Sequence, residues 1–588
     1  MTNNNIEAID EYLDRTDWRV NANANQGYSL GGLILNTTGK NIANYWMTKI
    51  YEPSIGQAHK NGDIHIHDLD MFAGYCCGHS LRNLLNEGYN GIPGKISSKA
   101  PKHLSSALGQ MVNFIGTLQN EWAGAQAFSS FDTLLAPFVR VEKLTYKQIK
   151  QLIEQFIFDL NVPSRWGTQT PFSNLTFDLV CPNDLKDIKP LVGGKEVDFT
   201  YGDLQVEADM LTKAFLEVML AGDGNSRVFS YPIPTFNITK EFNWDSEISN
   251  ILFEYAGKYG TPYFQNFINS DMDPSDVRSM CCRLSLDLNE LKKRGGGLFG
   301  ASEQTGSVGV VTLNMARIGG LYKEEKSFFS RINHLMEIAT SSLEKKRETL
   351  EHYLKHDLYP YTKRYVGTFR NHFSTIGVNG MNEMCLAYLG KDITSKEGQA
   401  FSLKVLDFMR DKLIDIQERT GHMYNLEASP AEGACYRFAK LDQSMYPNET
   451  IQSGTADAPY YTNSSQLPVG KVSDPFKIIE LQEGLQTKYT GGTVLHFFFG
   501  EKIDGASAKK FVKLICNKTR LPYITISPVF TICKTHGYIK GKHATCPTCG
   551  EVTEIWEKVM GYYRPIDWAN KGKQSEINER ITVTVGDK

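Results

Sequence analysis

Four residues near the C-terminus have the types and spacing of a metal site. Cys533 and His536 form a Cys-x-x-His pair, and after nine intervening residues Cys546 and Cys549 form a Cys-x-x-Cys pair. Two ligands from each of two tight turns close a tetrahedral zinc site and leave no open position for a substrate. The pattern predicts structural Zn²⁺, on which so small a unit would depend for folding. His543 is an alternative ligand to His536, and a reduced thiol pair is the alternative to a metal.

Gly561 follows this cluster, in the run Val-Met-Gly-Tyr-Tyr-Arg-Pro that begins at Val559. A glycine among large side chains ordinarily marks a positive φ or a close approach of another segment. Glycine also has a chemical use, because loss of one Cα hydrogen leaves a planar radical stabilised between the amide nitrogen and the carbonyl. A Gly-Tyr pair alone favours the ordinary explanation, so the rest of the chain has to decide.

Two pairs of adjacent cysteines lie far apart, Cys76-Cys77 and Cys281-Cys282. Adjacent cysteines do not readily form a disulfide with each other, so one thiol of a pair can face a site while its neighbour packs in the core.

Two polar turns could hold a ligand. Residues 427–438 place the carboxylate of Glu432 and one thiol between ordered elements. Residues 459–465 line up an amide with hydroxyls that include Ser464 and Ser465, and such groups hold oxygen-rich ligands. Local capping of the backbone is the alternative for both turns.

The segment Ile64 to Asp70 alternates like a strand, so His65 and His67 would project from one face. Two histidines at this spacing could bind a metal. Hydrogen-bonded strand histidines are the simpler interpretation, because a metal site needs further ligands and a second shell.

The composition is that of an ordinary globular protein, with 41% hydrophobic residues, 22% charged residues and a net charge of −3. It gives no electrostatic case for nucleic acid. No apolar run approaches the length of a membrane span, and the polar N-terminus does not resemble a secretory signal. Eleven cysteines in such a chain predict reduced thiols, metal ligands or catalytic groups. We expect a cytoplasmic protein that acts neither on nucleic acid nor at a membrane.

Predicted strands alternate with long predicted helices, which favours an α/β architecture. The helical segments are 100–119, 145–160, 323–354 and 395–420, and the strands are 169–179, 228–238 and 308–314. The glycines at 295–300 and 306–309 are in the wrong order for a P-loop or a dinucleotide-binding turn.

Taken in order, these motifs resemble those of the anaerobic (class III) ribonucleoside-triphosphate reductases, a family of glycyl radical enzymes. The resemblance runs from about residue 20 to about residue 580. Besides the Cys/His pairs and the glycine run, it rests on Asn-Gly-Asp-Ile-His-Ile-His-Asp from Asn61, Met-Cys-Cys-Arg-Leu from Met280 and Ser-Pro-Ala-Glu-Gly from Ser429.

The resemblance implies a ten-stranded α/β barrel built from two five-stranded halves. Residues 1–525 would form this catalytic barrel, with a finger loop around Cys282 inside it and no ATP-binding cone at the N-terminus. Residues 526–588 would form a small zinc-binding subdomain that carries the glycyl radical loop into the barrel.

The resemblance also implies a role for each catalytic residue. Gly561 would store the radical, Cys282 would become the transient thiyl, and Cys76 would be its partner thiol. Glu432 would transfer a proton at the ribose 3' hydroxyl, and Asn314 would lie near the reductant site. The side chains expected to contact substrate are His65, Ser464 and Ser465.

The implied reaction is reduction of ribonucleoside triphosphates to their 2'-deoxy forms. Formate would be the reductant, with a dithiol protein as the other possibility because Cys281 and Cys435 are additional thiols. A partner activase would generate the radical with S-adenosylmethionine and a 4Fe-4S cluster, and nucleotide effectors would bind at a homodimer interface near helices 100–160. The chain departs from the family in having Lys558 where arginine is common, which keeps the charge but loses the planar fork.

Two other functions fit part of the pattern. One is a glycyl radical acyltransferase or lyase that resembles pyruvate formate-lyase, although such enzymes generally lack the zinc pairs. The other is a non-enzymatic zinc-binding interaction protein, for which Cys76, Cys282, Glu432 and Gly561 would be coincidental.

Overall fold

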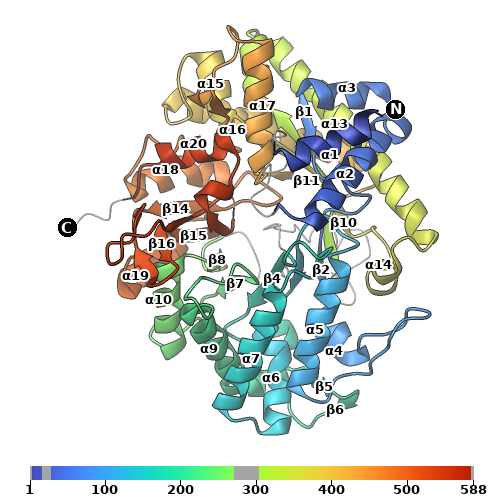
Figure 1. Cartoon of the computed structure of the whole chain (residues 1–588), viewed down its shortest axis with the longest axis vertical. Helices are drawn as coiled ribbons and strands as arrows, with labels where there is room; N and C mark the ends of the chain where they lie inside the picture. Colours follow the sequence, from blue (N-terminus) through green and yellow to red (C-terminus); the bar gives the residue numbers. More distant parts are fainter. Residues whose placement is uncertain (1–2, 16–27, 271–303, 560, 584–588) are drawn as a thin grey trace.

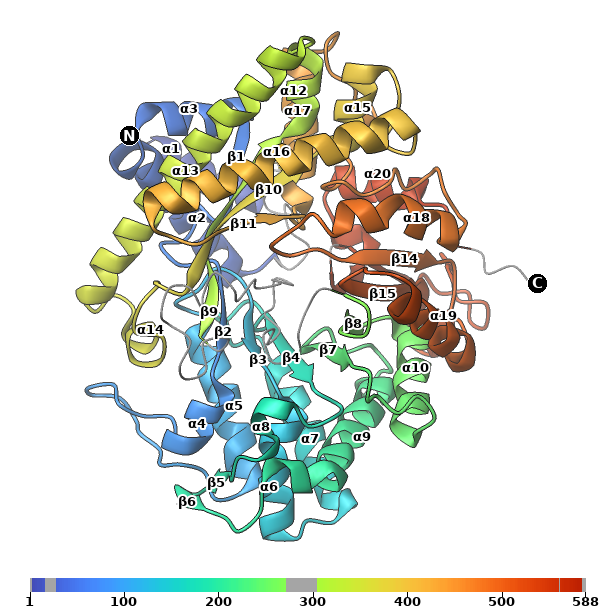
Figure 2. The same cartoon turned by 180° about the vertical axis from the view of Figure 1, so that it is seen from behind.

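The computed structural model describes residues 3–15, 28–270, 304–559 and 561–583, and in it helices surround one large sheet (Figure 1, Figure 2). Ten strands follow a single path, β11-β10-β9-β2-β3-β4-β7-β8-β15-β14, and β1 (Ile64–Ile66) pairs with β9 beside it. The path consists of β2 (Cys76–His79), β3 (Gln126–Phe128), β4 (Ser173–Phe177), β7 (Ile233–Ile238), β8 (Tyr263–Asn266), β9 (Thr305–Asn314), β10 (His372–Asn379), β11 (Tyr424–Glu427), β14 (Leu495–Phe499) and β15 (Tyr523–Pro528).

The path divides into two halves. Strands β2, β3, β4, β7 and β8 are parallel to their neighbours in one half. In the other half β9, β10 and β11 are parallel, as are β14 and β15. The halves meet antiparallel at β2/β9 and at β8/β15.

The two ends of the path also meet. Gly491 N donates to Leu426 O at 2.7 Å, and Ala428 N donates to Gly492 O at 2.8 Å, so β11 is hydrogen-bonded to the segment that leads into β14. The sheet therefore closes on itself. The predicted α/β barrel of ten strands in two halves is confirmed.

Helices cover the outer face of both halves (Figure 1, Figure 2). Every residue of β9 and β10 is buried, as expected for parallel strands covered on both faces. Around the first half, at the bottom of Figure 1, lie α5 (Leu104–Leu118), α6 (Phe131–Glu142), α7 (Tyr146–Asn161), α9 (Gln205–Ala221) and α10 (Glu247–Tyr259). Around the second lie α13 (Glu325–Lys355), α16 (Lys396–Thr420), α18 (Pro475–Gln486) and α19 (Gly505–Lys518).

Further helices and hairpins complete the barrel domain. The helices are α1 (Asn3–Leu13), α2 (Leu30–Tyr45), α3 (Pro53–Asn61), α4 (Leu81–Glu87), α8 (Asn183–Lys186), α12 (Met315–Leu321), α14 (Pro360–Tyr365), α15 (Met381–Leu389) and α17 (Glu432–Met445). Two small hairpins join β5 (Leu191–Val192) to β6 (Lys195–Glu196) and β12 (Ser453–Thr455) to β13 (Ala458–Tyr460). None of the helices in the described ranges is both long and apolar enough to cross a membrane.

Most of the predicted elements are present with shifted ends. The segment 145–160 is α7 (Tyr146–Asn161), whose buried face consists of Ile149, Ile153, Phe156, Ile157 and Leu160, with Leu152 half-buried beside it. The strand expected from Ile64 stops at Ile66, because the chain turns at Asp68, whose φ is 54°. The strand expected from Gln169 starts at Ser173, beyond Pro171, which has no N–H to donate to a ladder.

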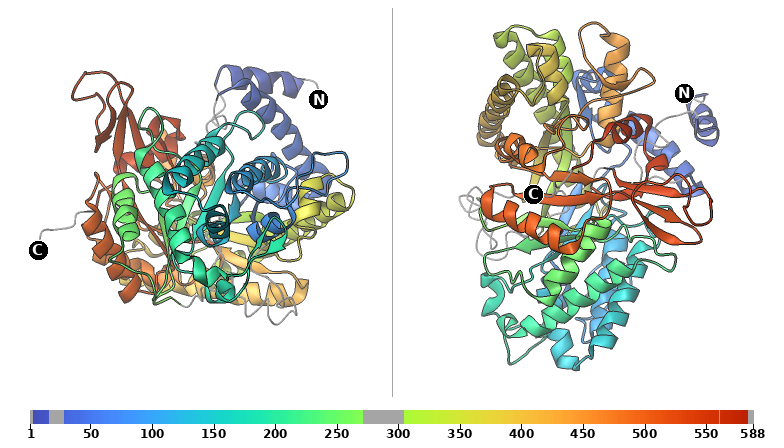
Figure 3. Two further views of the ribbon diagram at one scale, coloured as in Figure 1. Left: turned by 90° about the horizontal axis from the view of Figure 1, so that it is seen from below. Right: turned by 90° about the vertical axis from the view of Figure 1, so that its left-hand side faces the viewer.

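The C-terminal part forms a second, antiparallel sheet in the order β17-β16-β18-β19. Its strands are β16 (Phe530–Cys533), β17 (Gly537–Lys540), β18 (Glu554–Lys558) and β19 (Tyr563–Pro565), drawn in red in the right-hand view of Figure 3. The expected boundary after residue 525 falls inside barrel strand β15, which ends at Pro528. The last helix, α20 (Lys571–Glu579), returns to pack on α17 and β13.

Candidate active site and zinc site

The four predicted zinc ligands form one cluster, with all ligand atoms within 4.8 Å of one another. Cys533 Sγ lies 3.7 Å from Cys549 Sγ, and His536 Nδ1 lies 3.7 and 3.6 Å from the sulfur atoms of Cys533 and Cys546. Around a tetrahedral zinc with bonds of about 2.3 Å to sulfur, neighbouring ligand atoms are about 3.5–3.8 Å apart. The donor set therefore fits Zn²⁺. His543 is not part of the cluster, since its Nε2 lies 2.9 Å from the carbonyl oxygen of Lys540.

Gly561 lies at the tip of the hairpin formed by β18 and β19. Lys558 pairs with Tyr563, and Val559 N donates to Tyr562 O at 3.0 Å. Gly561 is buried and has a φ of 112°, a conformation that favours glycine. The conformational explanation for this glycine therefore holds, and it is compatible with the chemical one.

The zinc cluster lies beside the start of strand β18, and the hairpin tip follows the end of the same strand. Ile532, next to Cys533, is opposite Glu554 at the start of β18, whereas Lys558 leads into the tip. A strand of this length spans roughly 17 Å. The cluster can therefore brace the sheet that carries Gly561 without touching the glycine.

The hairpin is anchored to the barrel wall. Lys558 Nζ donates to Gly260 O at 2.6 Å and to Thr525 Oγ1 at 2.8 Å, and Tyr263 donates its phenolic hydrogen to Gly561 O at 2.6 Å. Tyr263 and Thr525 belong to neighbouring barrel strands, β8 and β15. The glycine loop thus contacts the barrel at the junction of its two halves.

A buried ion-pair network ties the hairpin to α20. Arg580 Nη1 lies 2.9 Å from Glu557 Oε2, and its Nη2 lies 2.9 Å from Glu576 Oε1. Nη1 also donates to Lys558 O at 3.0 Å. Burial alone would raise the pKa of Glu576, but the cations of Lys573 and Arg580 lower it, so this carboxylate stays charged in the interior.

Glu432 lies against the hairpin. It is the first residue of α17 and is buried, and the helix N-terminus favours a negative charge there. The hydroxyl group of Tyr562 donates to Glu432 Oε2 at 3.4 Å, and Asn570 Nδ2 donates to Oε1 at 3.5 Å. The structure therefore brings the predicted carboxylate next to the residue that follows Gly561.

The first cysteine pair occupies β2, whose register places Cys76 opposite Ser307 of β9. Cys76 is fully buried and disulfide-bonded. Cys77 belongs to the hydrophobic core, as expected, and its Sγ lies 3.7 Å from His79 Nδ1 and 3.5 Å from His372 Nε2. Cys281, Cys282 and the expected finger loop lie outside the described residues.

The Asn314 side chain belongs to a buried polar network at the end of β9. Its Nδ2 donates to Gly62 O at 3.0 Å and to Asp442 Oδ2 at 2.9 Å, and its Oδ1 accepts from Arg317 N, which caps α12. Arg317 Nε in turn donates to Asp442 at 2.8 Å. Both Nδ2 hydrogens of Asn314 are used in hydrogen bonds within the fold. The role of Asn314 near the reductant stays a prediction, and its Oδ1 atom would have to provide the contact.

His65 and His67 are neighbours, with ring centroids 4.6 Å apart. The Nε2 of His67 lies 2.8 Å from Thr312 Oγ1, and His65 Nδ1 lies 3.4 Å from Arg437 Nη1. Burial is the main cause that lowers both pKa values, that of His67 to about 3, so both rings are neutral. In the described ranges the C-terminal cluster is the only group of three or more possible metal ligands. The contacts therefore favour the simpler interpretation as hydrogen-bonded histidines, of which His65 lies in β1 and His67 follows its end.

The predicted substrate loop folds over the turn that precedes Glu432. Ser464 has a φ of 49°, and its N–H donates to Asn379 Oδ1 at 2.9 Å while its Oγ donates to Ser429 O at 3.4 Å. Ser465 is fully buried and accepts a hydrogen bond from Tyr489.

One cavity joins this loop to the hairpin. It has a volume of about 100 Å³, and its walls include Asn463, Ser464, His496, Val559 and Arg580. The loop expected to contact substrate and the hairpin expected to store a radical therefore border the same space.

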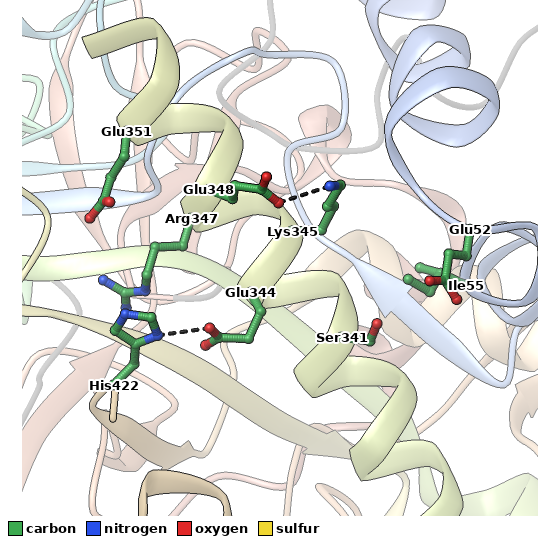
Figure 4. Close-up of a pocket in the computed structure, with 9 residues that line it drawn as sticks. All are labelled: Glu52, Ile55, Ser341, Glu344, Lys345, Arg347, Glu348, Glu351 and His422. Carbon is green, nitrogen blue, oxygen red and sulfur yellow. Dashed lines mark hydrogen bonds and ion pairs between the residues drawn. The ribbon is translucent and has the colours of Figure 1, made fainter. Parts of the chain in front are cut away.

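A larger groove of about 470 Å³ lies elsewhere, on the outer side of α13 (Figure 4). None of the predicted site residues lines it. Its carboxylates are partly neutralised, since His422 Nδ1 lies 2.7 Å from Glu344 Oε2 and Lys345 Nζ lies 2.8 Å from Glu348 Oε2. The groove is a salt-bridged surface apart from the candidate active site.

Comparison with known proteins gives one consistent result. Residues 22–582 match the family described as anaerobic ribonucleoside-triphosphate reductase. The reductase of that name from Escherichia coli is 24% identical over 577 residues, which cover 89% of this chain and 78% of the relative. The one from Enterobacteria phage T4 is 24% identical over 612 residues and covers 94% of each chain.

A solved structure has the same fold. The anaerobic ribonucleotide reductase from Thermotoga maritima, in complex with dATP and CTP, superposes with a TM-score of 0.74 at 19% identity. The superposition covers 97% of this chain and 98% of that one.

Proposed function

The chain belongs to the anaerobic ribonucleoside-triphosphate reductase family, whose members are oxidoreductases, and we propose that it reduces ribonucleoside triphosphates with a radical stored on Gly561. The observation that carries this proposal is the contact between Glu432 and Tyr562, because it places the carboxylate beside the glycine hairpin within the barrel.

The proposed reaction begins with transfer of a hydrogen atom. The Gly561 Cα–H bond and a thiol S–H bond are of similar strength, so the Gly561 radical can take a hydrogen atom from Cys282 and leave a thiyl there. The thiyl abstracts the ribose 3' hydrogen, and Glu432 accepts the proton of the 3' hydroxyl. The 2' hydroxyl leaves as water after gaining a proton, and Cys282 finally returns the hydrogen atom to C3'. The barrel contributes placement and exclusion of water.

The net reaction needs two electrons. Formate supplies them when it is oxidised to CO₂, so that the ribonucleotide, formate and one proton give the deoxyribonucleotide, CO₂ and water. Cys76 is the thiol that assists this step once its disulfide has been reduced. The surroundings of Cys435 support formate over a dithiol protein, because this thiol is buried, its Sγ lies 3.7 Å from Asn463 Oδ1, and burial raises its pKa.

The proposed partners follow from the family. A radical activase that uses S-adenosylmethionine and a 4Fe-4S cluster would remove the first hydrogen atom from Gly561. His65, Ser464 and Ser465 would contact the substrate. Nucleotide effectors would act at a homodimer interface in the cytoplasm. The dATP and CTP in the Thermotoga maritima complex support the nucleotide binding that this proposal requires.

The proposal is tested by anaerobic activation of the full chain with an activase and S-adenosylmethionine. The expected result is a doublet in the electron paramagnetic resonance spectrum, cleavage at Gly561 on exposure to air, and formate-dependent conversion of CTP to dCTP. Gly561→Ala should abolish all three, and the cleavage site in the unaltered protein identifies the radical without relying on that strained variant. Full activity of Gly561→Ala would overturn the mechanism.

A further inference from the structure

Tyr263 contacts the proposed radical residue from the barrel wall. It is the first residue of β8 and is almost completely buried. Its hydroxyl group donates to the carbonyl oxygen of Gly561 at 2.6 Å, across 298 positions in the sequence. The Gly561 carbonyl belongs to the group over which an unpaired electron on the Cα atom is shared.

Three neighbours fix the ring of Tyr263. Lys558 Nζ lies 4.2 Å from its centroid, a cation–π distance, and the ring of Tyr523 stacks on it at 5.4 Å. His496 meets it edge-on at 6.4 Å. Because the side chain is buried and packed on several sides, its hydroxyl group is held in place before any radical forms.

The hydrogen bond acts on the radical through the carbonyl group. In a glycyl radical the amide nitrogen donates electron density and the carbonyl withdraws it, so part of the spin and some negative charge move onto the oxygen. A proton donor aimed at that oxygen stabilises this distribution, and the effect is larger in a dry interior than in water. A closed-shell Gly561 gains less from the same bond, because its carbonyl carries less charge.

We infer that Tyr263 is a positioning residue that stabilises the Gly561 radical relative to the cysteine thiyl through this hydrogen bond. The inference rests on the proposed radical at Gly561 and adds a group that sets its stability. In the transfer itself one thiol S–H bond breaks and one Gly561 Cα–H bond forms, and the proton of Tyr263 stays on its oxygen throughout.

The test compares the Tyr263→Phe variant with the unaltered protein, both full-length and both activated anaerobically in D₂O. Pulsed electron–nuclear double resonance of the unaltered protein should show an exchangeable deuteron coupled to the radical, besides that of the Gly561 amide. Tyr263→Phe should lose this coupling, shift the g-values of the doublet, and store roughly three- to tenfold less radical, as expected for one hydrogen bond. Site-specific 3-fluorotyrosine at position 263 is a stronger hydrogen-bond donor of nearly the same shape, and it should increase the radical yield.

Tyr523→Phe is the matched control. It changes the stacked ring, whose own hydroxyl group is hydrogen-bonded to Thr235, and should keep the deuteron coupling. Two results would overturn this inference alone. One is a doublet from the unaltered protein that lacks the extra deuteron coupling, and the other is a deuteron coupling that persists unchanged in Tyr263→Phe. Absence of any doublet from the unaltered protein would instead overturn the proposed function.

Discussion

The hydroxyl group of Tyr562 donates a hydrogen bond to Oε2 of Glu432 at 3.4 Å, across 130 positions in the sequence. Tyr562 is the residue after Gly561, and Glu432 is the first residue of α17. Burial and the neighbouring Glu432 carboxylate raise the pKa of Tyr562 well above its usual value, so the phenol keeps its proton. Correct seating of the hairpin and the orientation of the carboxylate are thereby coupled.

Glu432→Gln should separate radical storage from turnover. The amide fills the same space at the start of α17 but cannot accept the proton of the 3' hydroxyl group. We expect a normal doublet after activation and a loss of dCTP formation of about 10²–10⁴-fold, the usual contribution of a positioned general base. Turnover at the unaltered rate would contradict the role assigned to Glu432.

Tyr562→Phe should have a smaller effect than Glu432→Gln. It removes the hydrogen bond from Tyr562 to the carboxylate and leaves the one from Asn570 at 3.5 Å. We expect roughly a tenfold loss of turnover or less, in line with the net energy of one hydrogen bond. The doublet should remain, which quantitative electron paramagnetic resonance can show. A complete loss of the doublet would mean that Tyr562 serves the radical itself rather than the carboxylate.

The sequence was sufficient for the Cys/His cluster and for the backbone conformation of Gly561, because each is determined by residues close together in the chain. The Cys-x-x-His and Cys-x-x-Cys pairs place two possible ligands in each of two tight turns, and Gly561 needs a φ that other residues adopt with strain. The helical segment 145–160 was likewise predicted nearly to its ends, as α7.

The contacts that position the site could not be read from the chain in the same way. Tyr263, Asn570 and Arg580 carry no local pattern that separates them from ordinary core or helix residues, and their partners lie 298, 138 and 23 positions away. Tertiary packing of strands and helices fixes these contacts, and a single sequence does not show which elements pack together. Strand ends were also misjudged near Asp68, where tertiary contacts rather than alternation decide where the chain turns.

Loss of the zinc cluster should impair radical storage without touching Gly561. Cys546→Ser removes one ligand, so the zinc content should fall from about one ion per chain to near zero. Since the cluster braces the far end of β18, we expect a lower melting temperature and less radical after activation. Cys181→Ser, in the loop after β4, is the matched control and should keep both. Full radical yield in a zinc-free protein would contradict a bracing role.

Acidification should destabilise the fold through buried histidines. Burial lowers the pKa of His79 to about 4 and that of His372 to about 3, with Arg347 adding to the shift at His372. Both therefore bind a proton on unfolding at any pH between these values and about 6.5, the ordinary histidine pKa. Stability is then complete above about pH 6.5 and declines as the pH falls, by about 2 kcal/mol for each residue at pH 5.

Urea unfolding at pH 7 and pH 5 measures this effect. His372→Gln should unfold more easily at pH 7, because it loses the packing on Trp122, but should lose less stability between pH 7 and pH 5. An equal pH dependence in the variant and the unaltered protein would show that the pKa of His372 in the fold is not lowered from its ordinary value.

Arg580→Gln should loosen the glycine hairpin specifically. Removal of one partner from a buried ion-pair network costs about 3–5 kcal/mol, because Glu557 and Glu576 remain buried with less compensation. Since Arg580 also donates to Lys558 O at 3.0 Å, its replacement should directly destabilise β18. We expect faster hydrogen exchange in β18 and β19, an unchanged zinc content and a lower radical yield.

Arg419→Gln, which breaks an exposed pair with Glu337, is the matched control. It should change the free energy of unfolding by about 1 kcal/mol or less and leave the amides of the hairpin protected from exchange. Equal protection of the hairpin in the two variants would mean that its seating depends on the barrel contacts of Lys558 and Tyr263 rather than on α20.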